Sequence, residues 1–397
     1  MKVENIFKED KKYILNVYNR INLEIVKSKG SYLYDKDGNK YLDMFSGLSV
    51  NNIGNSNEKI IQAILKQSSD YIHLSNYFVS KSVVNLAKLL VENTYASKVF
   101  FTNSGTESNE AAIKIARKFG SSINKGKTHI LSAYNSFHGR TLGSLSLTGQ
   151  EKYQKSFQPL LSNIDYFTYN NIKDLKQKVN EKTCAVFIEL IQGEGGIIEI
   201  DNSFVKCLNE LSKQYNFLII VDEIQTGLGR TGELLTSNYH DIKPHITTLA
   251  KSLGGGLPLG AVLVSKKVED ILSKGDHGST FGGNPVSCAS GEVVVNKVLE
   301  KDFKKSLRRK SNYLLNKLYI LKYKYPDIIK DIRGKGLMIG IDVGKYAFII
   351  KEKALEQKLI INITNETVIR LLPPLNIDTK EIDEFLDIFE VIISERI

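Results

Sequence analysis

Cysteine is scarce in this chain and long apolar runs are missing, which argues against several classes of protein. The three cysteines, Cys184, Cys207 and Cys288, lie far apart among 397 residues and form no CxxC pair. We therefore expect neither a zinc ribbon nor a disulfide framework, but reduced and mostly buried thiols. The longest apolar stretches, such as residues 217–221, are much shorter than the roughly 20 residues that cross a bilayer.

The chain has a basic excess, but its N-terminal residues do not look like a secretion signal. Residues 1–13 (MKVENIFKEDKKY) are charged and contain no apolar core, so we expect no signal peptide and a cytoplasmic protein. The formal net charge is +10, and the densest basic cluster spans residues 301–310 (KDFKKSLRRK). A solvated helix face is the favoured interpretation, because no zinc-finger spacing or RNA-binding aromatic signature accompanies the cluster. A nucleic-acid-binding protein stays a remote alternative.

The middle of the chain has the pattern of an α/β domain. Between residues 98 and 265, short apolar runs without alternation are separated by helical patterns. Such runs are typical of strands that are buried on both faces, so we predict a mostly parallel sheet. The predicted strands are residues 99–101, 130–133, 185–188, 218–221 and 261–264.

The two ends of the chain have a different pattern, which predicts a second, smaller domain. Residues 31–44 (SYLYDKDGNKYLDM) indicate a hairpin around an Asp-Gly-Asn turn. Beyond Pro285 we predict helices and strands that form an α+β unit: helices 286–298, 303–323 and 380–394, and strands 337–343 and 368–372. The length is consistent with two or three domains. We divide the chain into residues 1–50, which pack with the small domain, 51–285, the large domain, and 286–397, the small domain.

Two segments resemble nucleotide-binding motifs and are rejected. Residues 227–232 (GLGRTG) match G-x-G-x-x-G, but residues 222–226 separate them from the preceding predicted strand. Two acids at the end of that strand would also repel a pyrophosphate. Residues 120–128 (GSSINKGKT) have five rather than four residues between the glycines, and they precede a strand instead of following one.

A lysine and an aspartate are the strongest candidates for catalysis. Lys251 ends an apolar run and precedes three glycines in TLAKSLGGGLPL. At the edge of a pocket its pKa could fall, and the amine could then form a Schiff base. Asp222 stands at the C-terminal end of the predicted strand in FLIIVDEIQ, where α/β sheets bind ligands. It could be a base, a partner for a cationic ring nitrogen or a helix cap. The sequence contains no second acidic cluster and no histidine pair with metal-ligand spacing, so a metal site is not favoured.

Three further motifs supply groups for an anion, a planar ring and a carboxylate. In FFTNSGTESNE (residues 100–110), a strand, Ser-Gly-Thr and a helix follow one another. The helix N-terminus could bind a phosphate monoester, or the serine could be an ordinary cap. SFHGRTL (136–142) offers an aromatic ring that could stack and an arginine that could bind a carboxylate. GSTFGGNP (278–285) offers two hydroxyls. A Schiff-base lysine, an acid, a phosphate cradle and a stacking ring together indicate pyridoxal phosphate.

The same motifs carry a resemblance that extends from about Ile21 to Ile392. The chain resembles class III (ornithine-type) aminotransferases of PLP fold type I through the segments NSGTESNEAAIK, FHGRTLGSLSLTG, QGEGG, VDEIQTGLGRTG, TLAKSLGGGLPLGA and GSTFGGNP. The resemblance implies a large domain with a mostly parallel sheet, a smaller α+β domain, pyridoxal phosphate as the cofactor and a homodimer with shared active sites. It implies no metal, nucleic acid or membrane partner.

The resemblance is strongest to members that move the terminal amino group of N2-acetylornithine to 2-oxoglutarate, a step of arginine biosynthesis. Leu48 in FSGLSVNN aligns with a tyrosine of the ornithine-specific members, and an aliphatic residue there resembles the acetylornithine type. The alternatives keep the chemistry and change the donor to ornithine, succinylornithine, 4-aminobutyrate or acetyllysine.

The resemblance also implies roles for the residues that would hold the cofactor. Lys251 would form the Schiff base and then move a proton, and Asp222 would keep the pyridine nitrogen protonated. Gln225 would contact the 3-oxygen of the ring, and Phe137 would stack on its face. The phosphate would be bound by Ser104, Gly105 and Thr106, and by Thr280 of the neighbouring subunit.

Four residues would hold the substrates. By the same resemblance, Arg140 and Ser279 would bind the amino donor, and Arg370 in VIRLLPP would bind the carboxylate of the oxo acid. Glu194 in QGEGG would pair with Arg370 when the bound donor lacks that carboxylate.

Overall fold

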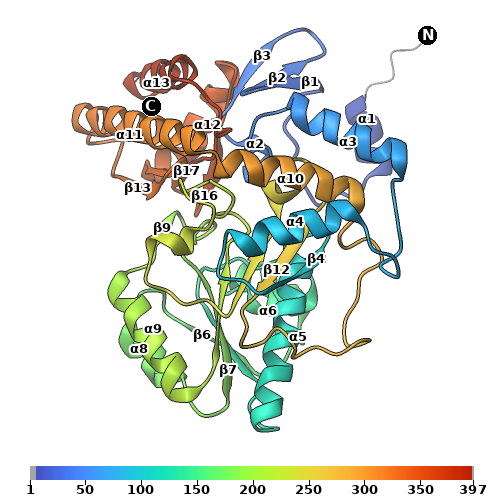
Figure 1. The fold of residues 1–397 in the computed structure, drawn as a ribbon. Helices are drawn as coiled ribbons and strands as arrows, with labels where there is room; N and C mark the ends of the chain where they lie inside the picture. Colours follow the sequence, from blue (N-terminus) through green and yellow to red (C-terminus); the bar gives the residue numbers. More distant parts are fainter. Residues whose placement is uncertain (1–5, 396–397) are drawn as a thin grey trace.

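The computed structural model describes residues 6–395, and its centre is a seven-stranded sheet (Figure 1). The strands in spatial order are β4 (Lys98–Thr102), β12 (Gly260–Val264), β11 (Ile246–Leu249), β10 (Leu218–Asp222), β7 (Thr183–Glu189), β5 (His129–Ala133) and β6 (Ile164–Phe167). All neighbouring strands are parallel except at β12, which runs antiparallel to both β11 and β4. The mostly parallel sheet is therefore confirmed, and β6 and β11 are strands that the sequence pattern missed.

Helices cover both faces of this sheet, which explains its unalternating apolar strands. One buried cluster joins Val186 and Ile219 of the sheet to Phe204 of α9, and a second joins Phe187 and Ile220 to α5. In Figure 1, α8 and α9 accordingly lie on one side of the strands and α5 on the other. The helices of this region are α5 (Gly105–Ile123), α6 (Leu142–Leu147), α7 (Glu151–Gln154), α8 (Ile172–Lys178) and α9 (Asn202–Tyr215).

A layer of helices joins this region to the rest of the chain. The helix α10 (Pro285–Leu299) packs against α3 (Glu58–Asp70) and α4 (Lys81–Glu92). It begins where the sequence favours a start, because Asn284 accepts hydrogen bonds from two backbone N–H groups and Pro285 occupies the first turn. The two short helices before this layer are α1 (Ile6–Tyr13) and α2 (Ser46–Ser49).

Both ends of the chain contribute to the smaller sheets. The predicted hairpin consists of β2 (Tyr32–Asp35) and β3 (Lys40–Asp43), and β3 also pairs with β15 (Leu359–Ile360) near the other end of the chain. The remaining strands are β1 (Ile25–Lys29), β8 (Ile191–Gln192), β9 (Ile198–Glu199), β13 (Asp331–Lys335), β14 (Met338–Asp342), β16 (Asn362–Thr364) and β17 (Val368–Leu371). The pairing of β3 with β15 supports the packing of the N-terminal segment on the C-terminal part, whereas division at residues 50 and 285 stays a prediction.

Helices cover the C-terminal sheet β13-β14-β17-β16. They are α11 (Lys301–Lys324), α12 (Ala347–Glu356) and α13 (Thr379–Ser394), and the 3-10 helices of the chain are η1 (Lys155–Phe157), η2 (Thr236–Tyr239), η3 (Lys251–Gly254) and η4 (Gly344–Tyr346). Within residues 6–395, no helix has the length and apolar character needed to span a membrane. Residues 1–5 of the predicted N-terminal segment and residues 396–397 lie outside the described part.

Candidate active site

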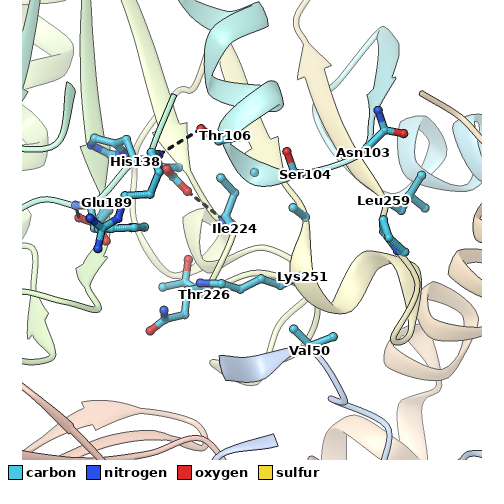
Figure 2. A pocket seen from close by; sticks show the side chains of 18 of the residues that line it. Val50, Asn103, Ser104, Thr106, His138, Glu189, Ile224, Thr226, Lys251 and Leu259 are labelled. Carbon is cyan, nitrogen blue, oxygen red and sulfur yellow. Dashed lines mark hydrogen bonds and ion pairs between the residues drawn. The ribbon is translucent and has the colours of Figure 1, made fainter. Parts of the chain in front are cut away.

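A cavity of about 480 Å³ opens at the C-terminal edge of the central sheet. Parallel α/β sheets bind ligands at this edge, because the strand ends and the helix N-termini meet there. Figure 2 shows Lys251 extending between Ile224 and Val50 in this view, with Glu189 and His138 on one side and Asn103 on the other. The predicted residues that line the cavity are Ser104, Gly105, Thr106, Phe137, Arg140, Glu194, Asp222, Gln225 and Lys251.

Asp222 is fixed by three hydrogen bonds. Its Oδ2 accepts from Asn109 Nδ2 at 2.9 Å and from His138 Nδ1 at 2.7 Å, and its Oδ1 accepts from the Ile224 N–H at 3.0 Å. Burial favours the neutral form of His138, but the hydrogen bond to Asp222 and its charge outweigh burial and raise the pKa of the imidazole. No helix follows β10 directly, so Asp222 is not a helix cap. Its carboxylate is an oriented acceptor at the cavity wall.

Lys251 follows β11 and starts the 3-10 helix η3 with a left-handed backbone, at φ 48°. This conformation is uncommon for a residue with a side chain, and such strain is typical of functional sites. Burial is the main reason why the pKa of its amine is lowered to about 8; the charge of Glu194 opposes the shift and that of Arg370 adds to it. A lysine that loses its proton near neutral pH can act as a nucleophile and as a base.

We expect Lys251 to react with an amine-selective acylating reagent with a midpoint near pH 8. Since only the neutral amine is nucleophilic, its reaction rate in the ligand-free protein should rise with pH and level off above about 8. The reaction rate of exposed lysines should keep rising until the pH reaches their usual pKa of about 10.4. Mass spectrometry of peptides from a pH series resolves the sites. A Lys251 rate that follows the exposed lysines would contradict the lowered pKa.

The N-terminus of α5 presents free N–H groups at the cavity wall. Gly105 and Thr106 are its first residues, so their N–H groups have no partner within the helix. Such groups favour a phosphate because they donate hydrogen bonds and carry the positive end of the helix dipole. Ser104 caps the helix, with its Oγ accepting from the Glu107 N–H at 3.3 Å. The serine is therefore a helix cap, as in the alternative interpretation, and the phosphate site at Gly105 and Thr106 stays a prediction.

The segment after β5 places an aromatic ring and an arginine at the cavity. Phe137 lines the wall, and its ring meets that of Tyr153 edge-on at 6.1 Å. The guanidinium of Arg140 lies 4.0 Å from the centre of the Tyr153 ring and 5.5 Å from that of Phe137. The arginine is exposed at the cavity rim and forms cation–π contacts, so it is free to exchange these for a ligand.

Arg370 lies behind the cavity wall in a network of acceptors. It is 2% exposed, and its Nη1 donates to Glu194 Oε1 at 2.6 Å and to Gln225 Oε1 at 3.2 Å. Its Nη2 donates to Asn362 Oδ1 at 2.6 Å. Burial would raise the pKa of Glu194, but the charge of Arg370 outweighs it and lowers that pKa. Glu194 therefore lies as an anion between Arg370 and the cavity.

Besides Arg370, two further predicted residues, Ser279 and Thr280, lie outside the cavity lining. Ser279 Oγ instead accepts a hydrogen bond from Asn103 Nδ2 at 3.1 Å, and Asn103 lines the cavity. Thr280 is exposed to solvent on the same loop. The role assigned to Thr280 needs a second subunit, so the single chain leaves it a prediction.

Three residues of the site were missed by the sequence analysis. Asn109 and His138 hold Asp222, and Glu189 lines the cavity at the end of β7. Glu189 carried a usable signal, because it ends an apolar strand as Asp222 does. His138 lies in the SFHGRTL motif but was given no role. Nothing in the sequence marked Asn109 apart from its place in the segment that forms α5.

A partly buried lysine of lowered pKa, an oriented carboxylate and the free N–H groups of a helix end are groups suited to chemistry on carbonyl and amino groups of a phosphorylated ligand. The model of the family "Aminotransferase class-III" matches residues 13–393, and the chain belongs to this family. The chain is 44% identical over 388 residues to an acetylornithine aminotransferase of Caldanaerobacter subterraneus subsp. tengcongensis, covering 97% of this chain and 98% of the relative. An acetylornithine aminotransferase of Methanocaldococcus jannaschii is 41% identical over 396 residues, covering 100% and 99%.

Solved structures of two related enzymes share the fold. The N-acetylornithine aminotransferase of Stenotrophomonas maltophilia superimposes with a TM-score of 0.85 at 29% identity and covers 98% of each chain. The ornithine aminotransferase of Toxoplasma gondii superimposes with a TM-score of 0.92 at 30% identity, covering 99% of this chain and 95% of the other. The Toxoplasma structure shows partial occupancy of PLP at its active site.

Proposed function

We propose that the chain transfers the terminal amino group of N2-acetylornithine to 2-oxoglutarate with pyridoxal phosphate as cofactor. The products are N-acetylglutamate 5-semialdehyde and glutamate, as in arginine biosynthesis. The observation that carries the proposal is the convergence of Lys251, Asp222 and the start of α5 on one cavity. The 41% to 44% identity to acetylornithine aminotransferases over nearly the whole chain supports this donor. A cytoplasmic location is part of the proposal and rests on the composition of the sequence.

The residues present fit pyridoxal phosphate. The N–H groups of Gly105 and Thr106 suit its phosphate, and Asp222, which only accepts hydrogen bonds when ionised, suits a protonated ring nitrogen. Glycine leaves room here, because a Cβ at this position would lie 2.7 Å from Ile224 Cδ1 and the isoleucine would have to shift. When bound, pyridoxal phosphate supplies an electron sink that stabilises the charge left when a proton leaves the substrate carbon.

The chain itself moves the proton and fixes the charges. Lys251 Nζ would take a proton from the substrate carbon and deliver it to the cofactor carbon, which its lowered pKa makes feasible near neutral pH. Asp222 would keep a proton on the ring nitrogen, and the hydrogen bonds from Asn109 and His138 hold its carboxylate in place. Phe137 would stack on the ring, and Gln225 would contact its 3-oxygen.

The pair of Arg370 and Glu194 gives the site two states for two substrates. With the amino donor bound, Glu194 stays on Arg370 as in this structure. The second carboxylate of 2-oxoglutarate displaces Glu194 and takes the guanidinium for itself. Arg140 and Ser279 bind the donor. Arg140 is at the cavity rim, whereas Ser279 lies outside the lining and contacts Asn103, a residue of the cavity wall.

We also propose a homodimer in which Thr280 of one subunit reaches the phosphate of the other. Support comes from exposed apolar side chains, which single chains rarely gather on their surface. The exposed apolar side chains include Leu15, Tyr77, Phe78, Val79 and Phe281. Phe281 is the neighbour of Thr280 in sequence, so the predicted shared loop belongs to this apolar set. A mass of one chain in solution would contradict the proposal.

A panel of amino donors tests the function. We expect kcat/KM for N2-acetylornithine to exceed that for ornithine, succinylornithine, 4-aminobutyrate and acetyllysine by at least about tenfold, the scale set by one or two kcal/mol of pocket contacts. The assay follows glutamate formation from 2-oxoglutarate with each donor. A different preferred donor would replace the proposed substrate. No turnover with any donor would contradict transamination itself.

A further inference from the structure

Glu189 is a buried acid of the cavity to which the proposed reaction gives no task. It is the last residue of β7 and lies in register with Asp222, the last residue of β10. The residue is 7% exposed and lines the cavity, on the same side as His138 in Figure 2. Burial is the main cause that raises the pKa of its carboxyl to about 7; nearby His138 opposes the rise and Asp222 adds to it. The hydroxyl of Tyr169 donates to its backbone carbonyl.

The carboxyl of Glu189 bridges two loops of the cavity wall. Its Oε2 accepts from the Phe137 N–H at 3.2 Å, and its Oε1 accepts from the Gly193 N–H at 3.3 Å. Phe137 belongs to the segment after β5, and Gly193 follows β8. The two loops therefore share one acceptor group, and each loop carries a residue with a role in the proposed reaction.

Gly193 links Glu189 to Arg370, the residue proposed to bind the substrate carboxylate. Its carbonyl accepts from Arg370 Nη1 at 3.3 Å and from Thr364 Oγ1 at 3.1 Å. A Cβ at Gly193 would lie 2.4 Å from Gln225 Oε1, so this peptide packs directly on the glutamine side chain. The N–H of Gly193 is held by Glu189 and its carbonyl by Arg370, so the peptide units on both sides of the Gly193 Cα are restrained.

We propose that Glu189 is a positioning residue that places Phe137 at the cofactor and Arg370 at the substrate carboxylate through these two hydrogen bonds. The inference rests on the proposed function for the identity of the two ligands. A carboxyl that served only the fold would stabilise the protein without affecting ligand binding. The two roles can therefore be separated by experiment.

Glu189→Gln is the test variant, because glutamine has nearly the same volume but only one acceptor oxygen. Its amide group must face one of the two N–H groups that the carboxyl accepts. Losing a hydrogen bond to a charged group corresponds to roughly 10- to 100-fold in affinity. We expect the apoprotein to bind pyridoxal phosphate more weakly by a factor in this range, and the holoenzyme to bind glutarate, an unreactive dicarboxylate, more weakly as well. Calorimetry measures both dissociation constants, since the chain contains no tryptophan for fluorescence.

Glu223→Gln is the matched control. Glu223 is 1% exposed and also accepts two backbone N–H groups, from Thr236 at 2.5 Å and Ser237 at 2.9 Å. Burial raises its carboxyl pKa too, but it does not line the cavity. We expect Glu223→Gln to lower resistance to urea while both dissociation constants stay at the wild-type values.

Equal dissociation constants in Glu189→Gln and Glu223→Gln would overturn the proposal and leave Glu189 a structural residue. If Glu189→Gln fails to fold, Glu189→Asp replaces it, because the shorter side chain keeps both oxygens but cannot reach both loops. Both dissociation constants are measured without turnover. A wild-type enzyme that does not transaminate N2-acetylornithine would therefore overturn the proposed function, while the pyridoxal phosphate measurement still tests Glu189.

Discussion

Replacing Lys251 by alanine should lower kcat by about 10³-fold or more, because in the proposed reaction one amine acts as both nucleophile and proton carrier. The substitution removes a partly buried side chain that lines the cavity with Asp222 and Glu194, and whose amine pKa is lowered to about 8 by burial. The variant should still bind pyridoxal phosphate, since Gly105 and Thr106 at the phosphate site are unchanged. Its visible band should differ from that of the wild type, because no lysine Schiff base can form.

Chemical rescue and a matched lysine separate catalysis from folding. A small amine such as methylamine should restore part of the activity of Lys251→Ala, because it can enter the space left by the side chain and move the proton. Lys310→Met is the control: burial also lowers the pKa of Lys310 to about 8, but its Nζ donates to the Leu375 carbonyl away from the cavity. We expect this control to lose stability and keep kcat. Full turnover in Lys251→Ala would contradict the proposed function.

The sequence pattern predicted the strands whose burial requires apolar residues. It missed strands that contain polar residues and are held by their pairing with neighbouring strands. Residues 185–188 and 218–221 are apolar throughout because helices cover both faces of the sheet, and both lie within strands. The strand β11 was missed because Thr247 and Thr248 are polar in sequence, yet both are fully buried. The strand β13 (DIRGK) was missed because its pairing with β14, not its composition, makes it a strand.

The site was predictable where a residue type and its place on a strand already limit the chemistry. Asp222 follows from an acid at the end of a buried strand, Lys251 from an amine between an apolar run and three glycines, and the start of α5 from a strand, Ser-Gly-Thr and a helix. A role that depends on contact with a side chain far away in the sequence cannot be predicted from residue type and local pattern. Asn109 holds Asp222 across 113 positions, and Arg370 meets Glu194 across 176. The pairing of Arg370 with Glu194 came from the family resemblance alone, and Asn109 was missed.

Asp222→Asn should lower kcat by about 10² to 10³-fold, the range found when an oriented electrostatic partner of the reacting centre is removed. The amide is neutral, so it no longer favours a protonated ring nitrogen. Its NH2 group must also face a donor, either the Ile224 N–H or the pair Asn109 Nδ2 and His138 Nδ1, all of which now donate to the carboxylate. Since the charge and the hydrogen bond of Asp222 raise the pKa of His138, that pKa should fall in the variant. NMR titration of the imidazole measures the fall.

Asp222→Glu separates the charge from its position. Glutamate keeps the charge, so the pKa of His138 should stay raised while the longer side chain moves the oxygens away from the Ile224 N–H that now fixes Oδ1. We expect kcat between the wild-type and Asp222→Asn values, since the electron sink needs both a protonated ring nitrogen and a partner at the right place. Single-turnover reaction with the amino donor isolates this step from product release. If Asp222→Asn keeps the wild-type rate in this assay, the ring nitrogen does not depend on Asp222, and another group must hold its proton.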